Sequence, residues 1–365
     1  MLHLCSSSCR HDPAVVRSRQ GNNDLLTVDF HCHILTPDVE SIVAGTPQKK
    51  AEPGLQLRLQ GEPSFVHNEV VVFPEANRRL SSVAERIADM DRMGVDIQVM
   101  SPSGVQYYYW ADEDIARKIV RMQNENVAEN CALYPDRLRG LGTVALQHPR
   151  LAVEQLRHCV RELGLQGIVV SSIVNGEDLS SPALEPLWRE AYDLECVVFI
   201  HPLGSSLGER LNTHYLCNII GQPIETTIAL SKLILDGVLD RHPGFKIVAA
   251  HGGGYLPSYI GRSEHGYAVR PGAGGPKCAP REYLKKIWFD TVVFDPLVVR
   301  HLIETVGASQ IVLGTDYPYD MGAYDVHEFI NSVPGITLDE RRQILGGNAA
   351  FLFGLDAQSL LSRIT

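Results

Sequence analysis

Long hydrophobic runs are missing from this sequence of 365 residues. A membrane-spanning helix needs roughly 20 consecutive apolar residues, and no stretch approaches that length. The first 24 residues also lack the continuous apolar core of a secretory signal peptide. We therefore expect no membrane segment, a flexible N-terminal extension over residues 1–24, and a location in the cytoplasm.

Cysteine pairs with the spacing of metal-binding motifs are missing as well. The eight cysteines are scattered, several of them inside apolar runs, at positions 5, 9, 32, 131, 159, 196, 217 and 278. This distribution favours reduced, mostly buried thiols over disulfides. An excess of positive charge is also absent, and the formal net charge of −10 argues against nucleic acid or an anionic membrane as the main partner.

Two histidines close the first apolar run of the chain. Residues 25–30 lead into His31, Cys32 and His33. In a strand, residues two positions apart point to the same face, so both imidazoles would lie on one side and Cys32 would point into packing on the other. Imidazole binds zinc, iron, nickel and copper, so the pair indicates a metal site without fixing the metal. A His-x-His pair by itself also occurs by coincidence on protein surfaces.

Three later apolar runs also end in a chemically useful side chain. They are residues 197–200 before His201, residues 246–250 before His251, and residues 310–315 before Asp316. Such histidines also occur as hydrogen-bonded core residues, and an aspartate before Tyr-Pro also fits a helix N-cap. The recurrence of the pattern at four strand ends favours one shared site.

Strand and helix signals alternate from residue 25 almost to the end of the chain. Eight strand–helix pairs in this order predict an α/β fold, a parallel sheet closed into a (β/α)8 barrel, with its active site at the carboxyl ends of the strands. We expect one barrel domain over residues 25–365. Residues 34–80 are too many for an ordinary connection, so we expect a small insertion over the barrel mouth, with a short β-like patch at residues 70–73.

The four strand ends predict a metal site of the catalytic type. Three imidazoles and one carboxylate, from His31, His33, His201 and Asp316, leave a place for water. A bound divalent metal lowers the pKa of that water and polarises a substrate oxygen, so Asp316 would serve catalysis as well as metal binding. His251 could be a fourth imidazole ligand, but it is better used as an acid/base beside the metal-bound water.

Two arginines and two aromatic residues are candidates for contacts with the substrate. Arg262 lies on the helix expected after the sixth strand, and Arg210 lies in the segment after the fifth. Each is either a carboxylate anchor with bidentate geometry or a solvent-exposed charge. Tyr109 and Trp110, in an aromatic loop after the second strand, indicate either the lining of an aromatic substrate pocket or a subunit interface.

Together these landmarks resemble the amidohydrolase superfamily and, within it, the branch of aminocarboxymuconate-semialdehyde decarboxylase and related decarboxylases. The matching segments follow one another from about residue 25 to residue 355. They are Asp29-Phe30-His31-Cys32-His33, Met90-Asp91-Arg92-Met93-Gly94-Val95, Tyr109-Trp110-Ala111, Gly140-Leu141-Gly142-Thr143, His201-Pro202, Pro223-Ile224-Glu225-Thr226-Thr227, His251-Gly252-Gly253-Gly254, Gly261-Arg262, Gly314-Thr315-Asp316-Tyr317-Pro318 and Gly347-Asn348-Ala349.

The resemblance implies roles for the strand-end residues. By this resemblance His31, His33, His201 and Asp316 bind zinc, with another divalent metal such as manganese as the alternative, and His251 is the acid/base. It also implies a homodimer in which Arg262 reaches into the active site of the neighbouring subunit.

The substrate-contacting positions depart from the resemblance. Pro74 stands where the decarboxylase has a carboxylate-binding arginine, and Leu203-Gly204 replaces a Trp-Asp pair. Pro318-Tyr319-Asp320 replaces Pro-Phe-Pro. We therefore expect a zinc-dependent, non-oxidative decarboxylase of a small carboxylated ene or aromatic acid, with a small anionic substrate other than aminocarboxymuconate semialdehyde.

Two alternatives remain at this point. A hydrolase on the same scaffold would cleave a carbon–carbon bond of a ring-fission product or an amide-like bond, and it would need fewer anionic anchors. A metal-binding barrel without catalysis would leave His251 without a purpose.

Overall fold

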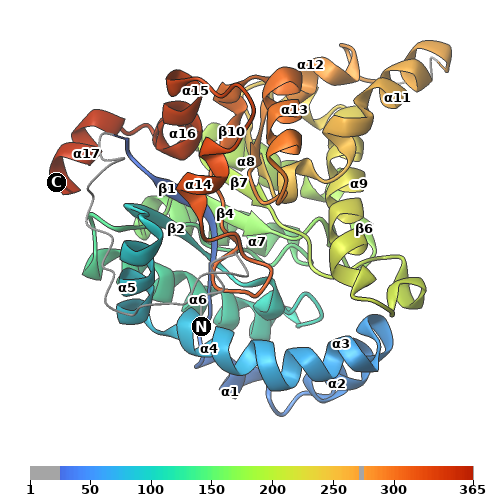
Figure 1. Ribbon diagram of the computed structural model, residues 1–365. Coiled ribbons are helices and arrows are strands. Elements are labelled where there is room, and N and C mark those ends of the chain that lie inside the picture. The colour runs from blue at the N-terminus through green and yellow to red at the C-terminus, as the bar shows by residue number, and fades with distance from the viewer. Residues whose placement is uncertain (1–24, 271–274, 365) are drawn as a thin grey trace.

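The computed structural model describes residues 25–270 and 275–364 (Figure 1). The expected extension over residues 1–24 lies outside the described residues. Parallel strands form a sheet of three in the order β1-β2-β3 and a sheet of five in the order β10-β9-β8-β7-β4. Their bounds are β1 (Val28–Ile34), β2 (Ile97–Pro102), β3 (Leu138–Gly140), β4 (Gly167–Val170), β7 (Val197–Ile200), β8 (Lys246–Ala249), β9 (Ile287–Asp290) and β10 (Ile311–Val312).

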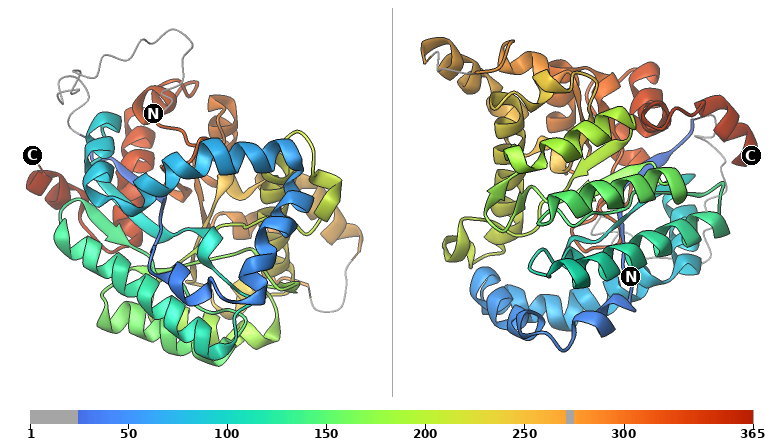
Figure 2. Two further views of the ribbon diagram at one scale, coloured as in Figure 1. Left: turned by 90° about the horizontal axis from the view of Figure 1, so that it is seen from below. Right: turned by 180° about the vertical axis from the view of Figure 1, so that it is seen from behind.

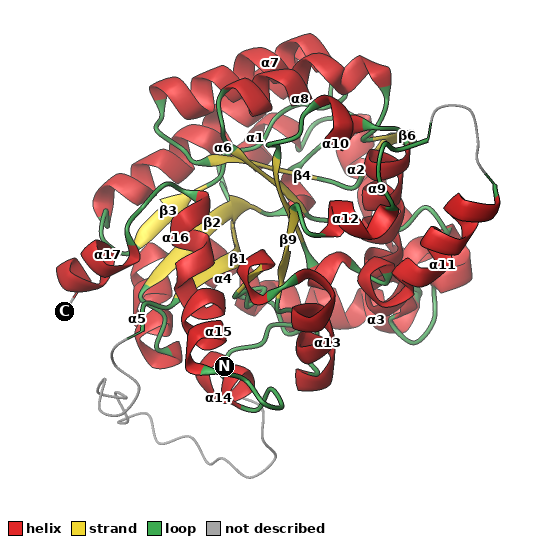
Figure 3. Ribbon diagram, turned by 90° about the horizontal axis from the view of Figure 1, so that it is seen from above, coloured by secondary structure: helices red, strands yellow, loops and turns green. Residues whose placement is uncertain are grey.

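Single bridges join the two sheets at both seams. Cys32 pairs with Tyr317 beyond β10, and Gly142 pairs with Ile168, so the order of strands closes on itself. Figure 3 shows the strands surrounded by helices. The predicted (β/α)8 barrel is therefore confirmed. A separate antiparallel hairpin, β5 (Ile173–Val174) and β6 (Glu177–Asp178), lies outside it.

Helices follow the strands on the outside of the barrel. Capping residues mark where these helices begin and end. Ser82 caps α5 (Val83–Met93) by accepting a hydrogen bond from the backbone of Glu85, and Gly94 ends that helix with φ of +70°. The other helices between and after the strands are α6 (Glu113–Leu133), α7 (Pro149–Arg157), α8 (Glu185–Asp193), α9 (Gln222–Leu235), α10 (Val238–Arg241), α11 (Leu256–Val269), α12 (Pro280–Leu284), α13 (Pro296–Val306), α14 (Val326–Asn331), α15 (Leu338–Arg342), α16 (Asn348–Leu352) and α17 (Ala357–Ile364). No helix in the described ranges is both long and apolar enough to cross a membrane.

The segment after β1 is helical throughout, which corrects one expectation. It holds α1 (Val39–Val43), α2 (Pro47–Gln60), α3 (Glu62–His67), the π-helical turn η1 (Asn68–Val72) and α4 (Phe73–Ser81). The β-like patch predicted at residues 70–73 is wrong. Val70 and Val71 are exposed and pair with no strand among the described residues, and the backbone hydrogen bonds close within the helix. Tertiary context here overrides the β-propensity of three consecutive valines.

The insertion is fastened at both sides of the barrel mouth. Gly61, with φ of +77°, lies so close to the loop after β7 that an added Cβ would be 1.8 Å from the carbonyl oxygen of Asn212. On the other side, Lys49 Nζ donates to the Tyr108 hydroxyl at 2.9 Å and pairs with Glu40 and Glu52. Because both contacts are with loops that follow strand ends, the helices α1–α4 lie across the carboxyl ends of the strands (Figure 2, left).

Candidate metal centre

The predicted ligands from three strand ends come together in one cluster. His31 and His33 leave β1 on the same face, His201 follows β7, and Asp316 follows β10. One nitrogen or oxygen atom from each of the four lies within 4.8 Å of the others. The Nε2 atoms of His31 and His33 are 3.2 Å apart, and Asp316 Oδ1 lies 3.3 and 3.1 Å from them. All four residues are buried. This is the grouping that the strand-end pattern predicts.

The donor set fits a divalent cation. Asp290 Oδ2 lies 2.6 Å from His31 Nδ1, so the proton of a neutral His31 sits on Nδ1 and the lone pair of Nε2 faces the Asp316 carboxylate. Lone pairs and a carboxylate oxygen at such distances repel one another unless a positive charge lies among them. Both nitrogens of His201 are buried without a hydrogen-bond partner in the described part of the chain. An unpartnered imidazole aimed at a carboxylate and two other imidazoles is what a metal site needs.

The pKa values show how strongly this cluster attracts positive charge. Burial lowers the pKa of His31, but the Asp316 and Asp290 carboxylates outweigh it and raise the value to about 10. Burial raises the pKa of Asp316, but His31 and His33 bring it well below its usual value. Burial and the neighbouring imidazoles hold the pKa of His201 well below its usual value. A metal ion would therefore take the place of a proton, and its affinity would weaken as the pH falls.

His251 stands beside the cluster as the sequence predicts. Its Nε2 lies 4.0 Å from Asp316 Oδ2, and its ring centroid lies 5.2 Å from that of His201. The residue has a left-handed backbone, with φ of +55°, and its N–H donates to Asp290 Oδ2 at 3.0 Å. Burial and the nearby His31 lower the pKa of its imidazole. A neutral imidazole held in this place can accept a proton and return it.

The two predicted arginine anchors do not join the cluster of their own chain. Arg262 lies on α11, which projects away from the barrel in Figure 1, and its side chain is exposed. Arg210 lies in the 3-10 turn Gly208–Leu211 and is exposed as well. Neither makes a hydrogen bond or an ion pair with another described residue. Their roles in substrate binding stay predictions.

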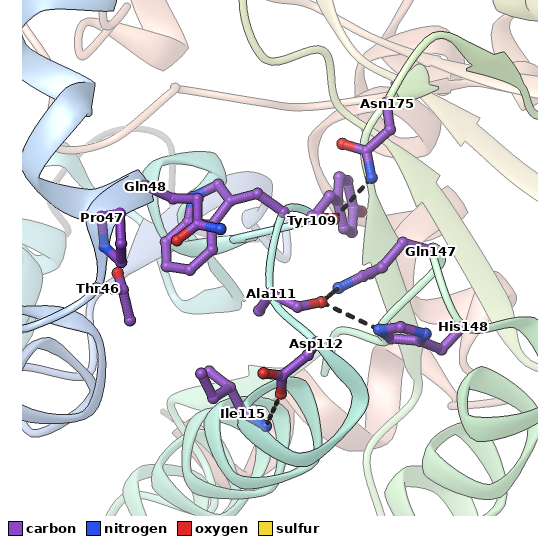
Figure 4. A pocket seen from close by; sticks show the side chains of 11 residues that line it. Thr46, Pro47, Gln48, Tyr109, Ala111, Asp112, Ile115, Gln147, His148 and Asn175 are labelled. Carbon is purple, nitrogen blue, oxygen red and sulfur yellow. Dashed lines mark hydrogen bonds between the residues drawn. The ribbon is translucent and has the colours of Figure 1, made fainter.

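Tyr109 and Trp110 line a cavity beside the insertion. The cavity has a volume of about 510 Å³ and lies among the start of α2, the loop before α6 and the loop before α7 (Figure 4). The backbone carbonyl of Tyr109 accepts a hydrogen bond from Asn175, and its hydroxyl accepts one from the backbone of Ser171 at the end of β4. The four clustered residues do not line this cavity. The two aromatic residues thus lie next to the mouth, and their contact with substrate stays a prediction.

Sequence reasoning missed three buried charged residues behind the cluster. Asp290 fixes the ring of His31 and the backbone of His251. Asp29, on β1, and Arg86, on α5, are fully buried. Asp290 shows the same sequence pattern as the predicted ligands, because it stands at the end of a strand. The β-branched residues Thr291, Val292 and Val293 hid it, because they made the strand seem to continue past that position.

The comparisons with known proteins agree with this geometry. A family model described as amidohydrolase matches residues 28–355. The chain belongs to the amidohydrolase family. Its relative in Dictyostelium discoideum, 2-amino-3-carboxymuconate-6-semialdehyde decarboxylase, is 37% identical over 345 residues, which cover 92% of this chain and 94% of the relative.

Two solved structures extend the comparison. The 5-carboxyvanillate decarboxylase of Sphingomonas paucimobilis matches this amidohydrolase with a TM-score of 0.79 and 27% identity, over 91% of this chain and 100% of the other. The 5-carboxyvanillate decarboxylase of Novosphingobium aromaticivorans, complexed with manganese and 4-hydroxy-3-methoxy-5-nitrobenzoic acid, matches with a TM-score of 0.80 and 23% identity, over 91% and 97% of the two chains. Both share the fold, and the cluster in this amidohydrolase is a divalent-metal site.

Proposed function

We propose that this amidohydrolase is a metal-dependent, non-oxidative decarboxylase of a small carboxylated aromatic or ene acid. The observation that carries the proposal is the buried cluster of three imidazoles and one carboxylate with His251 beside it. It occurs in a chain that aligns over 92% of its length with a decarboxylase. The described fold also resembles that of two decarboxylases of aromatic acids.

The residues of the chain divide the chemistry between them. His31, His33, His201 and Asp316 would hold a divalent metal, whose positive charge would polarise a substrate oxygen and acidify bound water. His251 Nε2 lies 4.0 Å from Asp316 Oδ2, where its neutral imidazole can take up a proton from solvent. In the reaction the carbon–carboxylate bond breaks, its electron pair stays on the ring or ene carbon, and that carbon takes the proton from the protonated His251, which returns to its neutral form. CO2 leaves, and neither substrate nor product is oxidised.

The carboxylate anchor in this proposal is Arg262 of the partner subunit in a homodimer. Pro74 removes the other arginine that the resemblance implies. Arg79 cannot replace it, because its buried side chain pairs with Glu75 at 2.8 Å and lies 3.7 Å from Asp89. The exposed position of Arg262 on a projecting helix supports a contact with a second chain.

We infer that the resident metal is zinc. Imidazole nitrogen and carboxylate oxygen are both donors that zinc binds in proteins, and imidazole suits it well. Manganese is the alternative, because one related structure holds it. Metal analysis of the isolated protein, followed by reconstitution of the metal-free chain with each ion, distinguishes the two. Location in the cytoplasm stays a prediction that fractionation of source cells would test.

The hydrolase alternative is not favoured by any contact in the described residues. The three similar proteins named above are all called decarboxylases.

The test is to incubate the metal-loaded protein with a panel of carboxylated phenols, muconic semialdehydes and ring-fission products. Loss of CO2 from one of them, abolished in the metal-free protein, supports the proposal. Products that gain water instead would favour the hydrolase. Protein that carries metal but converts no member of a broad panel would count against catalysis.

A further inference from the structure

Candidate metal ligands lie on both sides of the seam between β1 and β10. His31 and His33 lie on one side of the seam and Asp316 on the other. Regular pairing is sparse here. A single bridge joins Cys32 to Tyr317. Main-chain hydrogen bonds also cross the seam, from Phe30 N–H to the Leu313 carbonyl at 2.8 Å and from His33 N–H to the Tyr317 carbonyl at 2.9 Å. Side-chain contacts act together with these bonds in setting the distance between the two ligand segments.

Asp29 accepts four hydrogen bonds, and the two from Thr315 cross the seam. Its Oδ1 accepts from the backbone N–H of His31 at 3.2 Å and from that of Thr315 at 3.0 Å. Its Oδ2 accepts from the Thr315 hydroxyl at 2.6 Å and from Gln98 Nε2 at 2.8 Å. Asp29 is fully buried and makes no contact with a substrate-accessible surface. All four partner groups are hydrogen-bond donors, and an ionised carboxylate has only acceptor atoms to offer them.

The Thr315 hydroxyl extends this contact to the backbone that presents Asp316. It donates to Asp29 and accepts from the backbone N–H of Tyr317 at 3.1 Å. Asp316, between these two residues, has φ of +59°, in the left-handed region that a residue with a Cβ seldom adopts. Its own N–H donates to the carbonyl of His31 at 2.8 Å. The turn is thus held in a strained form by bonds to the strand that carries the other ligands.

The same network also reaches His33. Gln98, which donates to Asp29, accepts from a guanidinium nitrogen of Arg86 at 2.8 Å, and Arg86 also donates to the backbone carbonyl of His33. Three of the four predicted ligands therefore have backbone bonds into one buried polar network.

We propose that Asp29 and Thr315 form a clamp that sets the position of Asp316 relative to His31, and that the affinity of the site for its metal depends on this clamp. Both are positioning residues, since they touch neither the metal nor the substrate. The inference rests on the metal site of the proposed function. Substitution of residues that hold metal ligands in place typically lowers metal affinity by about 10–100-fold.

Thr143 offers a matched control. It is a buried threonine near the other seam of the barrel, and its hydroxyl donates to the carbonyl of Val169 at 3.1 Å. Thr143→Val and Thr315→Val make the same change of side chain, and each removes a buried hydroxyl from the barrel. Only the Thr315 hydroxyl bonds to residues, Asp29 and Tyr317, that lie within two positions of candidate metal ligands in the chain. Thr315→Ser keeps the hydroxyl and should rescue the site.

The measurement is the dissociation constant for Zn²⁺ or Mn²⁺, obtained by competition with a chromophoric chelator at fixed pH, together with the thermal midpoint of the metal-free chain. We expect Thr315→Val to raise the dissociation constant by about 10–100-fold, while Thr315→Ser and Thr143→Val stay close to the original protein. If Thr315→Val is insoluble, Asp29→Asn replaces it, because the amide nitrogen would face donors at two of the four contacts.

Unchanged affinity in Thr315→Val would overturn the clamp. So would an equal loss in Thr143→Val or in Thr315→Ser, since the effect would then come from general loosening of the barrel. An original chain that binds neither ion would contradict the metal site itself, which is a different failure from that of the clamp.

Discussion

The strand ends and the insertion that covers them are built in opposite ways. Every residue of β1 is buried, including His31 and His33, whereas α2 and α3 of the insertion contain no buried residue. The ligands of the metal site are therefore part of the barrel core, and the barrel cannot form without placing them. The helices α1 and α4 bury apolar side chains such as Val39, Val43 and Leu80, whereas α2 and α3 attach by a few polar and backbone contacts. The sequence of α2 and α3 can therefore change without loss of the fold.

The residues proposed for the reaction lie in the core, whereas the positions that depart from the resemblance lie at the mouth. The metal cluster and His251 match the resemblance residue for residue, and they belong to the core. The departures at Pro74, Leu203 and Tyr319 all lie in α4 or in loops after strand ends. The departures from the resemblance are thus confined to the mouth, which is the basis of the proposal that the substrate is not aminocarboxymuconate semialdehyde.

The strongest test of the core is removal of a ligand. His31→Ala and His201→Ala should each leave the chain with almost no bound metal and no activity, because a three-imidazole site loses one of its donors. Metal content per chain, measured by elemental analysis after dialysis, gives the result. Retention of metal in both variants would contradict the site.

The next largest effect is expected at His251. His251→Asn should keep the metal and lower kcat by about 10²–10⁴-fold, because a general acid/base contributes that much. Metal content and kcat are measured on the same preparation. A normal rate with metal bound would give His251 a structural role.

A smaller effect is expected from the carboxylate anchor at the mouth. Arg262→Ala should lower kcat/KM by about 10–100-fold, since a charge-assisted hydrogen bond contributes about 1.5–3 kcal/mol. Metal binding should not change. To test donation between subunits, an Arg262→Ala chain is mixed with a His251→Asn chain, because one site of each mixed dimer then has both residues.

Recovery of activity in verified mixed dimers supports donation of Arg262 across the interface. A mixture that stays inactive would mean that the arginine, if it acts, acts within its own chain.

The smallest effect is expected at the fastening of the insertion. Gly61→Ala places a Cβ against the carbonyl of Asn212 and forces a residue with a Cβ into a backbone region reserved for glycine, at a cost of about 1–3 kcal/mol. We expect a higher KM and a lower thermal midpoint, with metal affinity unchanged. Gly45→Ala, in the same insertion but in open space, is the control and should leave both values unchanged.

The parts of the molecule that sequence could predict are those with a short-range signal. Alternating strands and helices gave the barrel, and polar residues after apolar runs gave the ligands, because a strand end is a local feature that fixes where its next side chain lies. Cys32 is also as expected, buried with its thiol against the carbonyl of Val99. The cysteines of the described residues are all free, and Cys5 and Cys9 lie outside them.

The rest depends on contacts between distant segments. The valines at 70–72 are typical of a strand, and the local sequence does not show whether a partner strand lies beside them. Asp29, Arg86 and Gln98 look like ordinary polar residues in a strand and a helix, and only the folded chain shows that they meet behind the ligands. In the proposal Arg262 acts in the active site of a second chain, and the sequence of one chain carries no local signal for such a contact. The single barrel domain over residues 25–365 stays a prediction.

The most direct test of the central claim is the fate of the carboxylate and of the solvent proton. A carboxyl-labelled substrate that the panel identifies is turned over in D2O by the metal-loaded enzyme. Non-oxidative decarboxylation predicts that the label appears in CO2 and that the product carries deuterium at the carbon that lost the carboxylate, with no change in oxidation state. Label that remains in the organic product, with gain of the elements of water, would contradict the account.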